Sequence, residues 1–234
     1  MAGITFKNPV KIFPDKLCIF GKKDYKNLIK HEYPKEILEI TGDVRNKKVK
    51  EMNKMNIDLK RKKLLFLTQG PAFTSKQTIK IIEPIFEWIK KNPEWNLTIK
   101  LHPDDRYYLL YWFYSLKYGI KTKIIKNTDL SKLIDNSDLI ITKKSTAGIE
   151  CVAKYKPILI EWIDSEKHFK LFNDYFDTEF YDVETLDKQI KKITSSNYFE
   201  KYKKQREKFL DDYSAGYGTA PEKIAKIIKK MLLE

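Results

Sequence analysis

From residue 63 onward the sequence alternates short apolar runs with longer amphipathic segments, and this alternation constrains the fold more than any other feature. The apolar runs have the length of strands, and the amphipathic segments repeat with the period of helices. Such an order is typical of a parallel sheet, because parallel strands need crossover connections that are usually helical. The expected strands are residues 64–68, 97–101, 122–126, 139–142, 157–161 and 179–183.

These runs are almost continuously hydrophobic, which indicates strands covered on both faces. The sequence therefore predicts an α/β fold, a Rossmann-like parallel six-stranded sheet with helices on both faces. The expected helices are residues 76–91, 105–117, 130–136, 146–154, 167–175 and 185–194.

Residues 1–62 have a different character. Residues 17–20 and 37–41 resemble two short strands, whereas residues 46–62 are basic with few core candidates. This segment is too short for a second Rossmann domain. We expect residues 1–62 to be the remnant of an N-terminal domain with a basic linker, and residues 63–234 to form one Rossmann-like domain. Apolar residues at helical spacing in 220–234 predict a last helix.

Composition sets further bounds. A chain of 234 residues with 42% hydrophobic content can bury a full core. No apolar stretch approaches the roughly 18 residues that cross a bilayer, and the N-terminus lacks a signal-peptide pattern, so a cytoplasmic location is expected. Cys18 and Cys151 stand far apart without metal-ligand spacing. Two reduced thiols and no metal site are expected.

The net charge of +14 suggests anionic partners. Lysines dominate over arginines and no nucleic-acid-binding motif is present, so no specific nucleic acid is expected as a partner. A lysine-rich genome composition would explain the charge equally well. A basic surface directed toward a membrane or an anionic acceptor stays open.

Two polar motifs follow expected strands. Residues 100–103 (KLHP) end one strand, and residues 145–150 (STAGIE) follow another and begin a helix. Ligands of open parallel sheets bind beyond the carboxyl ends of the strands, so both motifs are expected at one site. The hydroxyls of Ser145 and Thr146 and the positive helix end favour a phosphate, although Ser145 could serve only as an N-cap.

Other residues at these strand ends have two interpretations each. Gln69 and Gly70 belong to a third strand-end loop that contacts a ligand or simply forms a Gly-Pro turn. Lys143 and Lys144 either attract a diphosphate or a carboxylate, or are solvated. The His-Pro dipeptide could likewise only terminate a strand.

Four segments together resemble the donor-binding, C-terminal half of GT-B glycosyltransferases: residues 14–21 (PDKLCIFG), residues 39–45 (EITGDVR), the His-Pro motif and the Ser-Thr motif. The chain is similar to bacterial-type sialyltransferases and polysialyltransferases and to CDP-glycerol glycerophosphotransferases, with UDP-GlcNAc 2-epimerase as a structural cousin. The resemblance covers nearly the whole chain. It implies a role in surface or capsule polysaccharide biosynthesis, with a CMP-, CDP- or UDP-linked donor as substrate and no further cofactor.

The resemblance also implies residue roles. His102 and Pro103 match the motif that contacts the donor's nucleotide and phosphate, and Glu150 matches an acidic residue that accepts from ribose hydroxyls. Gly148 would let the backbone approach a ligand, whereas a glutamate early in a helix is favourable without one. Lys143 and Lys144 replace an aspartate and an aromatic of glycerophosphotransferase-like relatives, which weakens the CDP-glycerol interpretation. The expected donor-binding residues are Gln69, Gly70, His102, Pro103, Lys144, Ser145, Thr146, Gly148 and Glu150.

No catalytic residue can be assigned from the sequence. Inverting GT-B enzymes supply the base from an N-terminal acceptor domain, and the spacing of Glu161, Asp164 and His168 singles out none of them. The expected partners are a nucleotide sugar, a glycan or lipid-linked acceptor, and a partner subunit or missing N-terminal domain. An epimerase-like enzyme and a non-catalytic nucleotide-binding subunit are the alternatives.

Residues 107–114 are unusually rich in aromatic side chains. In a helix, Leu109, Phe113 and Leu116 are expected to face the sheet, with Tyr107, Tyr111 and Tyr114 on a neighbouring stripe. One sheet cannot cover the whole circumference. The remaining stripe is buried under another helix, or contacts a second copy, a partner subunit or, peripherally, the inner face of the membrane.

Overall fold

The computed structural model describes residues 13–47, 49, 62–70, 74–143, 145–162 and 171–233. Contacts within the chain divide it into two compact units, one of residues 1–48 with 211–234 and one of residues 49–210. This division differs from the expected boundary at residue 62, because the C-terminal residues contact the N-terminal segment. That the smaller unit is the remnant of a larger domain stays a prediction.

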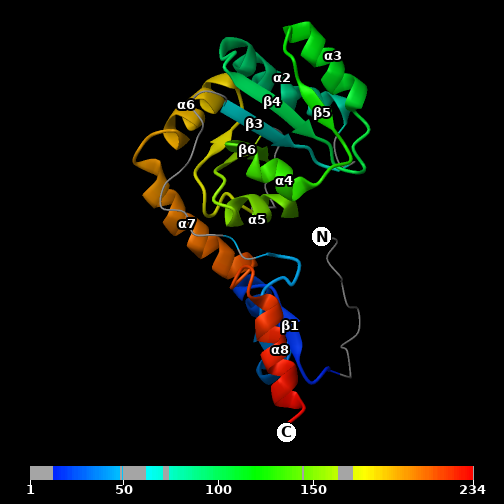
Figure 1. Ribbon diagram of the computed structural model, residues 1–234, viewed down its shortest axis with the longest axis vertical. Helices are drawn as coiled ribbons and strands as arrows, with labels where there is room; N and C mark the ends of the chain where they lie inside the picture. The colour runs from blue at the N-terminus through cyan, green and yellow to red at the C-terminus, as the bar shows by residue number, and fades with distance from the viewer. Residues whose placement is uncertain are drawn as a thin grey trace. The chain divides into compact units, whose positions relative to one another are not determined.

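Among the described residues, the larger unit contains a six-stranded parallel sheet, which confirms the predicted fold class (Figure 1). The spatial order is β5-β4-β3-β6-β7-β8. In chain order within the unit this is 3-2-1-4-5-6, the arrangement of dinucleotide-binding Rossmann domains. The strands are β3 (Lys62–Leu67), β4 (Trp95–Lys100), β5 (Lys123–Ile125), β6 (Leu139–Thr142), β7 (Ile158–Glu161) and β8 (Glu179–Phe180).

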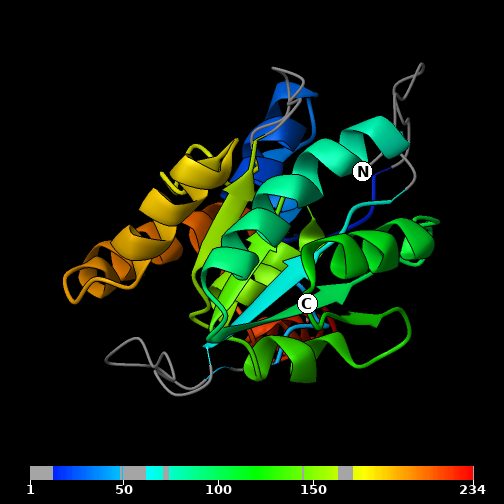
Figure 2. The same ribbon diagram turned by 90° about the horizontal axis from the view of Figure 1, so that it is seen from above.

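Helices cover both faces of this sheet, as Figure 2 shows. They are α2 (Ser75–Lys91), α3 (Tyr108–Tyr118), α4 (Leu130–Asp135), α5 (Thr146–Ala153) and α6 (Val183–Ile193). Helix α2 contacts both α3 and α6, whereas α4 contacts α5. Strand β8 is shorter than predicted because Asp182 already caps α6 by accepting from Thr185 N at 2.8 Å. The expected helix 167–175 is not formed by residues 171–175, which make turns, and residues 167–170 lie outside the described residues.

The order in which successive strands are added to the sheet reverses between β3 and β6. Leu64 of β3 pairs with Leu97 of β4 on one side and with Leu139 of β6 on the other. All three side chains are buried. The connections from β3 lead toward β5 and those from β6 lead toward β8, so the carboxyl ends of β3 and β6 flank the topological switch point. This is where the fold places a ligand crevice.

The face of helix α3 that packs on the core is not the one that the sequence predicted. Tyr111 and Tyr114 are buried, whereas Leu109, Phe113 and Leu116 are exposed. The Tyr111 hydroxyl donates to Oδ2 of the buried Asp105 at 3.0 Å. A buried carboxylate needs hydrogen-bond donors, so tyrosines rather than aliphatic side chains occupy the inner face.

Helix α7 (Tyr198–Tyr213) was not predicted from the sequence. Arg206 donates to the carbonyl oxygens of Val152 at 3.0 Å and Ala153 at 2.7 Å, which satisfies acceptors at the end of α5. The Tyr202 hydroxyl donates to Lys156 O at 2.6 Å. The apolar residues of α7 are mainly aromatic and are separated by lysines, so its periodicity is weak in the sequence.

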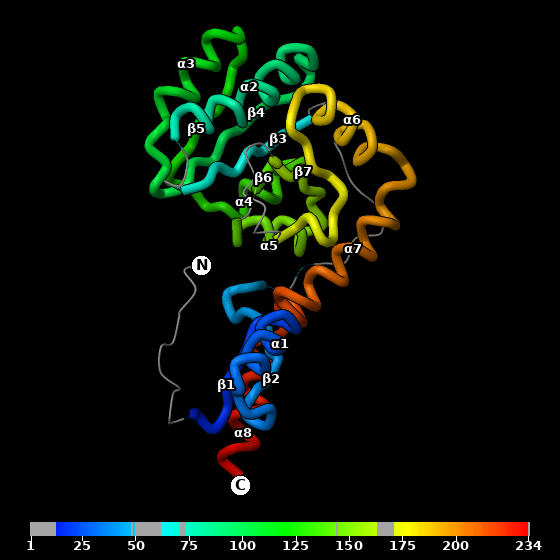
Figure 3. Tube along the Cα trace, turned by 180° about the vertical axis from the view of Figure 1, so that it is seen from behind, coloured from blue at the N-terminus to red at the C-terminus, as the bar shows by residue number. Residues whose placement is uncertain are grey.

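The smaller unit contains the two predicted short strands, β1 (Leu17–Ile19) and β2 (Leu38–Ile40), which pair in parallel. They are connected by α1 (Lys22–Lys30) and the 3-10 turn η1 (Lys35–Ile37), and α8 (Ala220–Met231) belongs to the same unit (Figure 3). Its small core contains Ile19, Ile37 and Leu38. In the described part of the chain, no helix is both long and apolar enough to span a membrane.

Candidate functional site

A cavity of about 270 Å³ lies in the larger unit at the carboxyl ends of the strands. Four neighbouring strands contribute to it. Gln69 and Gly70 follow β3, residues 104–107 follow β4, Lys143 follows β6, and Glu161 ends β7. Phe66, Leu67, Ile81 and Tyr111 supply apolar walls. The cavity therefore combines an apolar interior with a few convergent polar groups, as small-molecule sites do.

Two charged side chains that line the cavity form a buried ion pair. Lys143 Nζ lies 3.2 Å from Glu161 Oε2, and the side chains are 9% and 2% exposed. Adjacent strands β6 and β7 bring them together. Two charges withdrawn from water are tolerated only when they remain paired. Glu161, one of the three acids and bases considered from the sequence, is thus paired with Lys143. Asp164 and His168 lie outside the described residues.

Gln69 carries a buried donor that has no acceptor. Its Nε2 atom is inaccessible to solvent and makes no hydrogen bond, and the residue lines the cavity. An unsatisfied buried amide costs about 1–3 kcal/mol. An oxygen of a ligand in the cavity would relieve that cost.

His102 lies beside the cavity and contacts one of its lining residues. A Cβ atom at Gly70 would stand 3.2 Å from both Cε1 and Nδ1 of the imidazole, so the ring packs directly on the glycine. The Nδ1 atom accepts from Asp104 N at 3.2 Å, which leaves Nε2 as the donor of a neutral imidazole. His102 N itself donates to Thr68 Oγ1 at 2.9 Å. Pro103 is exposed in the turn that follows.

The Ser-Thr motif begins helix α5 as predicted but does not line the cavity. Ser145 Oγ accepts from Ala147 N at 3.2 Å, the geometry of an N-cap. Thr146 is exposed at the first helical position. Lys144, another expected contact, lies outside the described residues.

Gly148 has a packing role in the structure. A Cβ atom there would lie 2.5 Å from Cζ of Phe172, a fully buried ring. The space that the sequence interpretation assigned to an approaching ligand is occupied by this ring.

We expect Gly148→Ala to lower the free energy of unfolding by about 1–3 kcal/mol, because the added methyl group overpacks the contact with Phe172. Denaturant titration followed by circular dichroism measures the change. Thr146→Ala, an exposed position in the same turn, is the control and should stay within about 0.5 kcal/mol of the wild type. An unchanged midpoint for Gly148→Ala would contradict the packing role.

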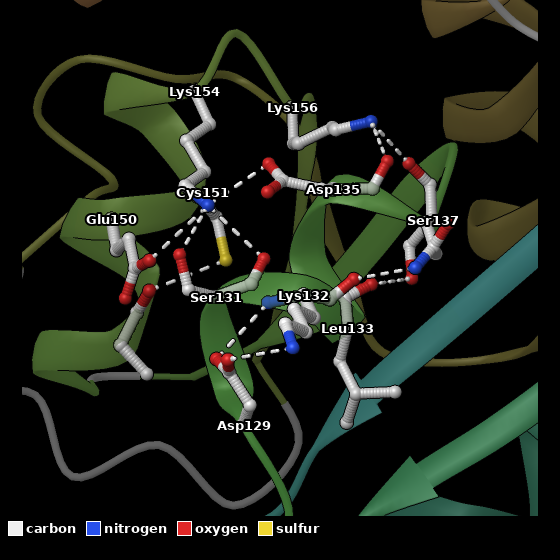
Figure 4. Close-up of polar contacts among 12 residues, drawn as sticks. Asp129, Ser131, Lys132, Leu133, Asp135, Ser137, Glu150, Cys151, Lys154 and Lys156 are labelled. Carbon is white, nitrogen blue, oxygen red and sulfur yellow. Dashed lines mark hydrogen bonds and ion pairs between the residues drawn. The ribbon is translucent and has the colours of Figure 1, made fainter. Parts of the chain in front are cut away.

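Glu150 belongs to a polar cluster between α4 and α5 (Figure 4). Lys154 Nζ lies 3.5 Å from Glu150 Oε1 and 2.9 Å from Asp135 Oδ1, and it donates to Ser131 O at 3.0 Å. This cluster joins the two helices. It gives Glu150 a structural contact, and its expected contact with a ribose stays a prediction.

The family of the chain is shown by its sequence. The family model described as "Capsule polysaccharide biosynthesis protein" matches residues 19–161, more than half of the chain. The chain belongs to this family. The matched range runs from the end of β1 to the end of β7 and includes all four strand ends at the cavity. No curated protein matches the chain significantly.

Solved structures resemble this chain in fold. The S. aureus MnaA–UDP structure has a TM-score of 0.62 at 15% identity, covering 93% of this chain and 60% of that one. The structure of UDP-GlcNAc 2-epimerase from Methanocaldococcus jannaschii with UDP-GlcNAc and UDP has a TM-score of 0.60 at 19% identity, and the match covers 92% of this chain and 61% of that one. The structure of the wall teichoic acid polymerase TagF has a TM-score of 0.57 at 15% identity, and the match covers 94% of this chain and 59% of that one.

At these identities the likeness shows the fold alone, and it confirms the expected resemblance to GT-B-type proteins at that level. The chain spans about three fifths of the length of these proteins.

Proposed function

We propose that this chain binds a nucleotide-activated sugar and supplies the donor half of a glycosyl transfer in capsule polysaccharide synthesis. The cavity at four adjacent strand ends, beside the topological switch point, is the observation that carries this proposal. Family membership supplies the biosynthetic setting. Structural neighbours described with UDP or as a wall teichoic acid polymerase support the substrate class.

The cavity accepts one part of such a donor. Its volume of about 270 Å³ lies just below the roughly 300–1,000 Å³ of sites for drug-sized ligands, so the rest of the donor extends outside. The amide of Gln69 turns toward the cavity, and its Nε2 atom, which is buried and unpartnered in the chain alone, then donates to an oxygen of the part of the donor enclosed there. Phe66 and Tyr111 contact a ring of that part. His102 Nε2, beside the Gly70 wall, donates to a phosphate oxygen.

We expect His102→Ala to weaken binding of a pyrimidine nucleotide about 10- to 100-fold, since a charge-assisted hydrogen bond contributes about 1.5–3 kcal/mol. Isothermal titration calorimetry with CMP, CDP and UDP measures the affinity and identifies the base. His31→Ala is the matched control, because His31 is exposed in the smaller unit and should leave binding unchanged. Equal affinities of the wild type and His102→Ala would remove His102 from the site.

Ser145→Ala separates two roles of the α5 terminus. If the helix end contributes to phosphate binding, affinity falls together with that of His102→Ala. If Ser145 is only an N-cap, stability falls by about 0.5–2 kcal/mol while affinity is retained. Thermal unfolding with and without nucleotide distinguishes these results.

An epimerase-like reaction is a second candidate, favoured by the likeness to UDP-GlcNAc 2-epimerases. Incubation with UDP-GlcNAc followed by proton NMR distinguishes it. Appearance of the 2-epimer would replace the transferase proposal, whereas binding without epimerisation supports it.

A further inference from the structure

Helix α3 has an exposed face of large apolar side chains. The helix is apolar around most of its circumference, and its inner face is already occupied by Tyr111 and Tyr114. We call the remaining set the α3 face: Tyr108, Leu109, Trp112, Phe113 and Leu116, which are 49%, 73%, 50%, 55% and 60% exposed. A helix that is hydrophobic all round is normally covered on every side. The α3 face therefore marks a contact surface.

The segment that forms α3 and continues to β5 carries charge of a single sign. Between residues 107 and 126 the chain carries Lys117, Lys121, Lys123 and Lys126 and no acidic residue. Lys121 and Lys123 are exposed in and before β5, the edge strand that α3 contacts (Figure 1). Lys117 has a partner in Glu83 of α2, at 3.6 Å.

We propose that the α3 face docks on an anionic lipid surface. Tryptophan, tyrosine and phenylalanine beside leucine, bordered by lysines, are the composition of helices that lie in the interfacial layer of a membrane. The lysines complement anionic headgroups. A second copy fits less well, because pairing two α3 faces would bring the lysines of the two 107–126 segments together, and Glu83 of α2 is already paired with Lys117 of its own copy.

The position of α3 gives this docking a consequence for the cavity. Tyr107 and Tyr111 line the cavity, and the Tyr111 hydroxyl holds Asp105 at 3.0 Å. The helix that would contact the lipid is thus also a wall of the cavity. Docking would hold the cavity near a lipid-borne acceptor, a consequence that rests on the proposed function, whereas the docking itself does not.

Co-sedimentation with phosphatidylcholine vesicles, with and without phosphatidylglycerol, tests the proposal on the full chain. We expect binding to the anionic vesicles only, falling as salt is raised. The triple variant Leu109→Gln/Phe113→Gln/Leu116→Gln should bind at least about 100-fold more weakly than the wild type, because three apolar side chains no longer enter the interface. Its thermal transition should remain cooperative, since all three side chains are exposed.

A matched control lies at another exposed apolar segment beside lysines, in α8 and the residues that follow it. Ile228, Leu232 and Leu233 are 51%, 81% and 79% exposed, and their triple replacement by glutamine should leave vesicle binding unchanged. Lys121→Gln/Lys123→Gln should weaken anionic binding by roughly fivefold per lysine. Trp112 supplies a direct signal, because it is exposed, whereas Trp88 and Trp95 are buried and Trp162, after β7, is half-buried. Its fluorescence should shift to the blue on anionic vesicles, and Trp112→Phe should remove the shift.

Three results would overturn the proposal. The first is a wild-type chain that does not bind anionic vesicles. The second is loss of binding in the Ile228/Leu232/Leu233 variant but not in the α3 variant. The third is a self-associating wild type that the α3 variant converts to a monomer in sedimentation velocity, which would assign the α3 face to a second copy.

Discussion

Replacing Lys143 by methionine is expected to lower the free energy of unfolding of the larger unit by about 3–5 kcal/mol. The carboxylate of Glu161 is 2% exposed and lies 3.2 Å from the ammonium group. Without Lys143 this carboxylate keeps its desolvation penalty and loses the ammonium group that lies 3.2 Å from it. Hydrogen exchange of the β6 and β7 amides, measured with denaturant titration, reports on this unit separately from the smaller one.

Two further variants show whether burial causes the effect. Lys143→Met/Glu161→Leu should recover most of the stability, because replacing both members of a buried pair by apolar groups is close to neutral or stabilising. Lys191→Met breaks an exposed pair on α6, where Lys191 Nζ lies 2.6 Å from Asp187 Oδ2. Its effect should stay within about 1 kcal/mol. Equal small losses for Lys143→Met and Lys191→Met would show that the buried pair contributes no more than a surface pair.

Gly42→Ala is expected to destabilise the smaller unit by roughly 2–5 kcal/mol, combining left-handed backbone strain with overpacking. Gly42 follows β2 with a φ of +94°, and an added Cβ atom would fall on the carbonyl oxygen of Ala215, well inside van der Waals contact. Backbone atoms cannot move aside as a flexible side chain would. Protection of the β1 and β2 amides from hydrogen exchange measures the loss.

Gly119→Ala measures the cost of left-handed backbone strain without overpacking. Gly119 ends α3 with a φ of +67°, and nothing lies within 4 Å of an added Cβ atom. This variant should lose only about 1–2 kcal/mol, measured on the larger unit. A loss at Gly42 no greater than that at Gly119 would contradict the close approach to Ala215.

The candidate site was only partly predictable from the sequence. Gln69 and Gly70 line the cavity as strand-end residues should, and His102 contacts Gly70. The buried pair of Lys143 and Glu161 was not predicted, because these residues are 18 positions apart and meet only when β6 and β7 align. The sequence feature that could have indicated this pair is a lysine and a glutamate at the ends of consecutive apolar runs.

The sequence by itself determined the six parallel strands, since an apolar run bounded by amphipathic segments has few other ways to bury its surface. It also determined where ligands are expected, because parallel strands present their carboxyl ends on one edge. Only the tertiary structure decided which faces and partners are used. Tyr111 faces inward because Asp105 is buried beneath it, and Gly148 is a glycine because Phe172 lies against it. Such choices depend on atoms distant in the chain, and no local pattern encodes them.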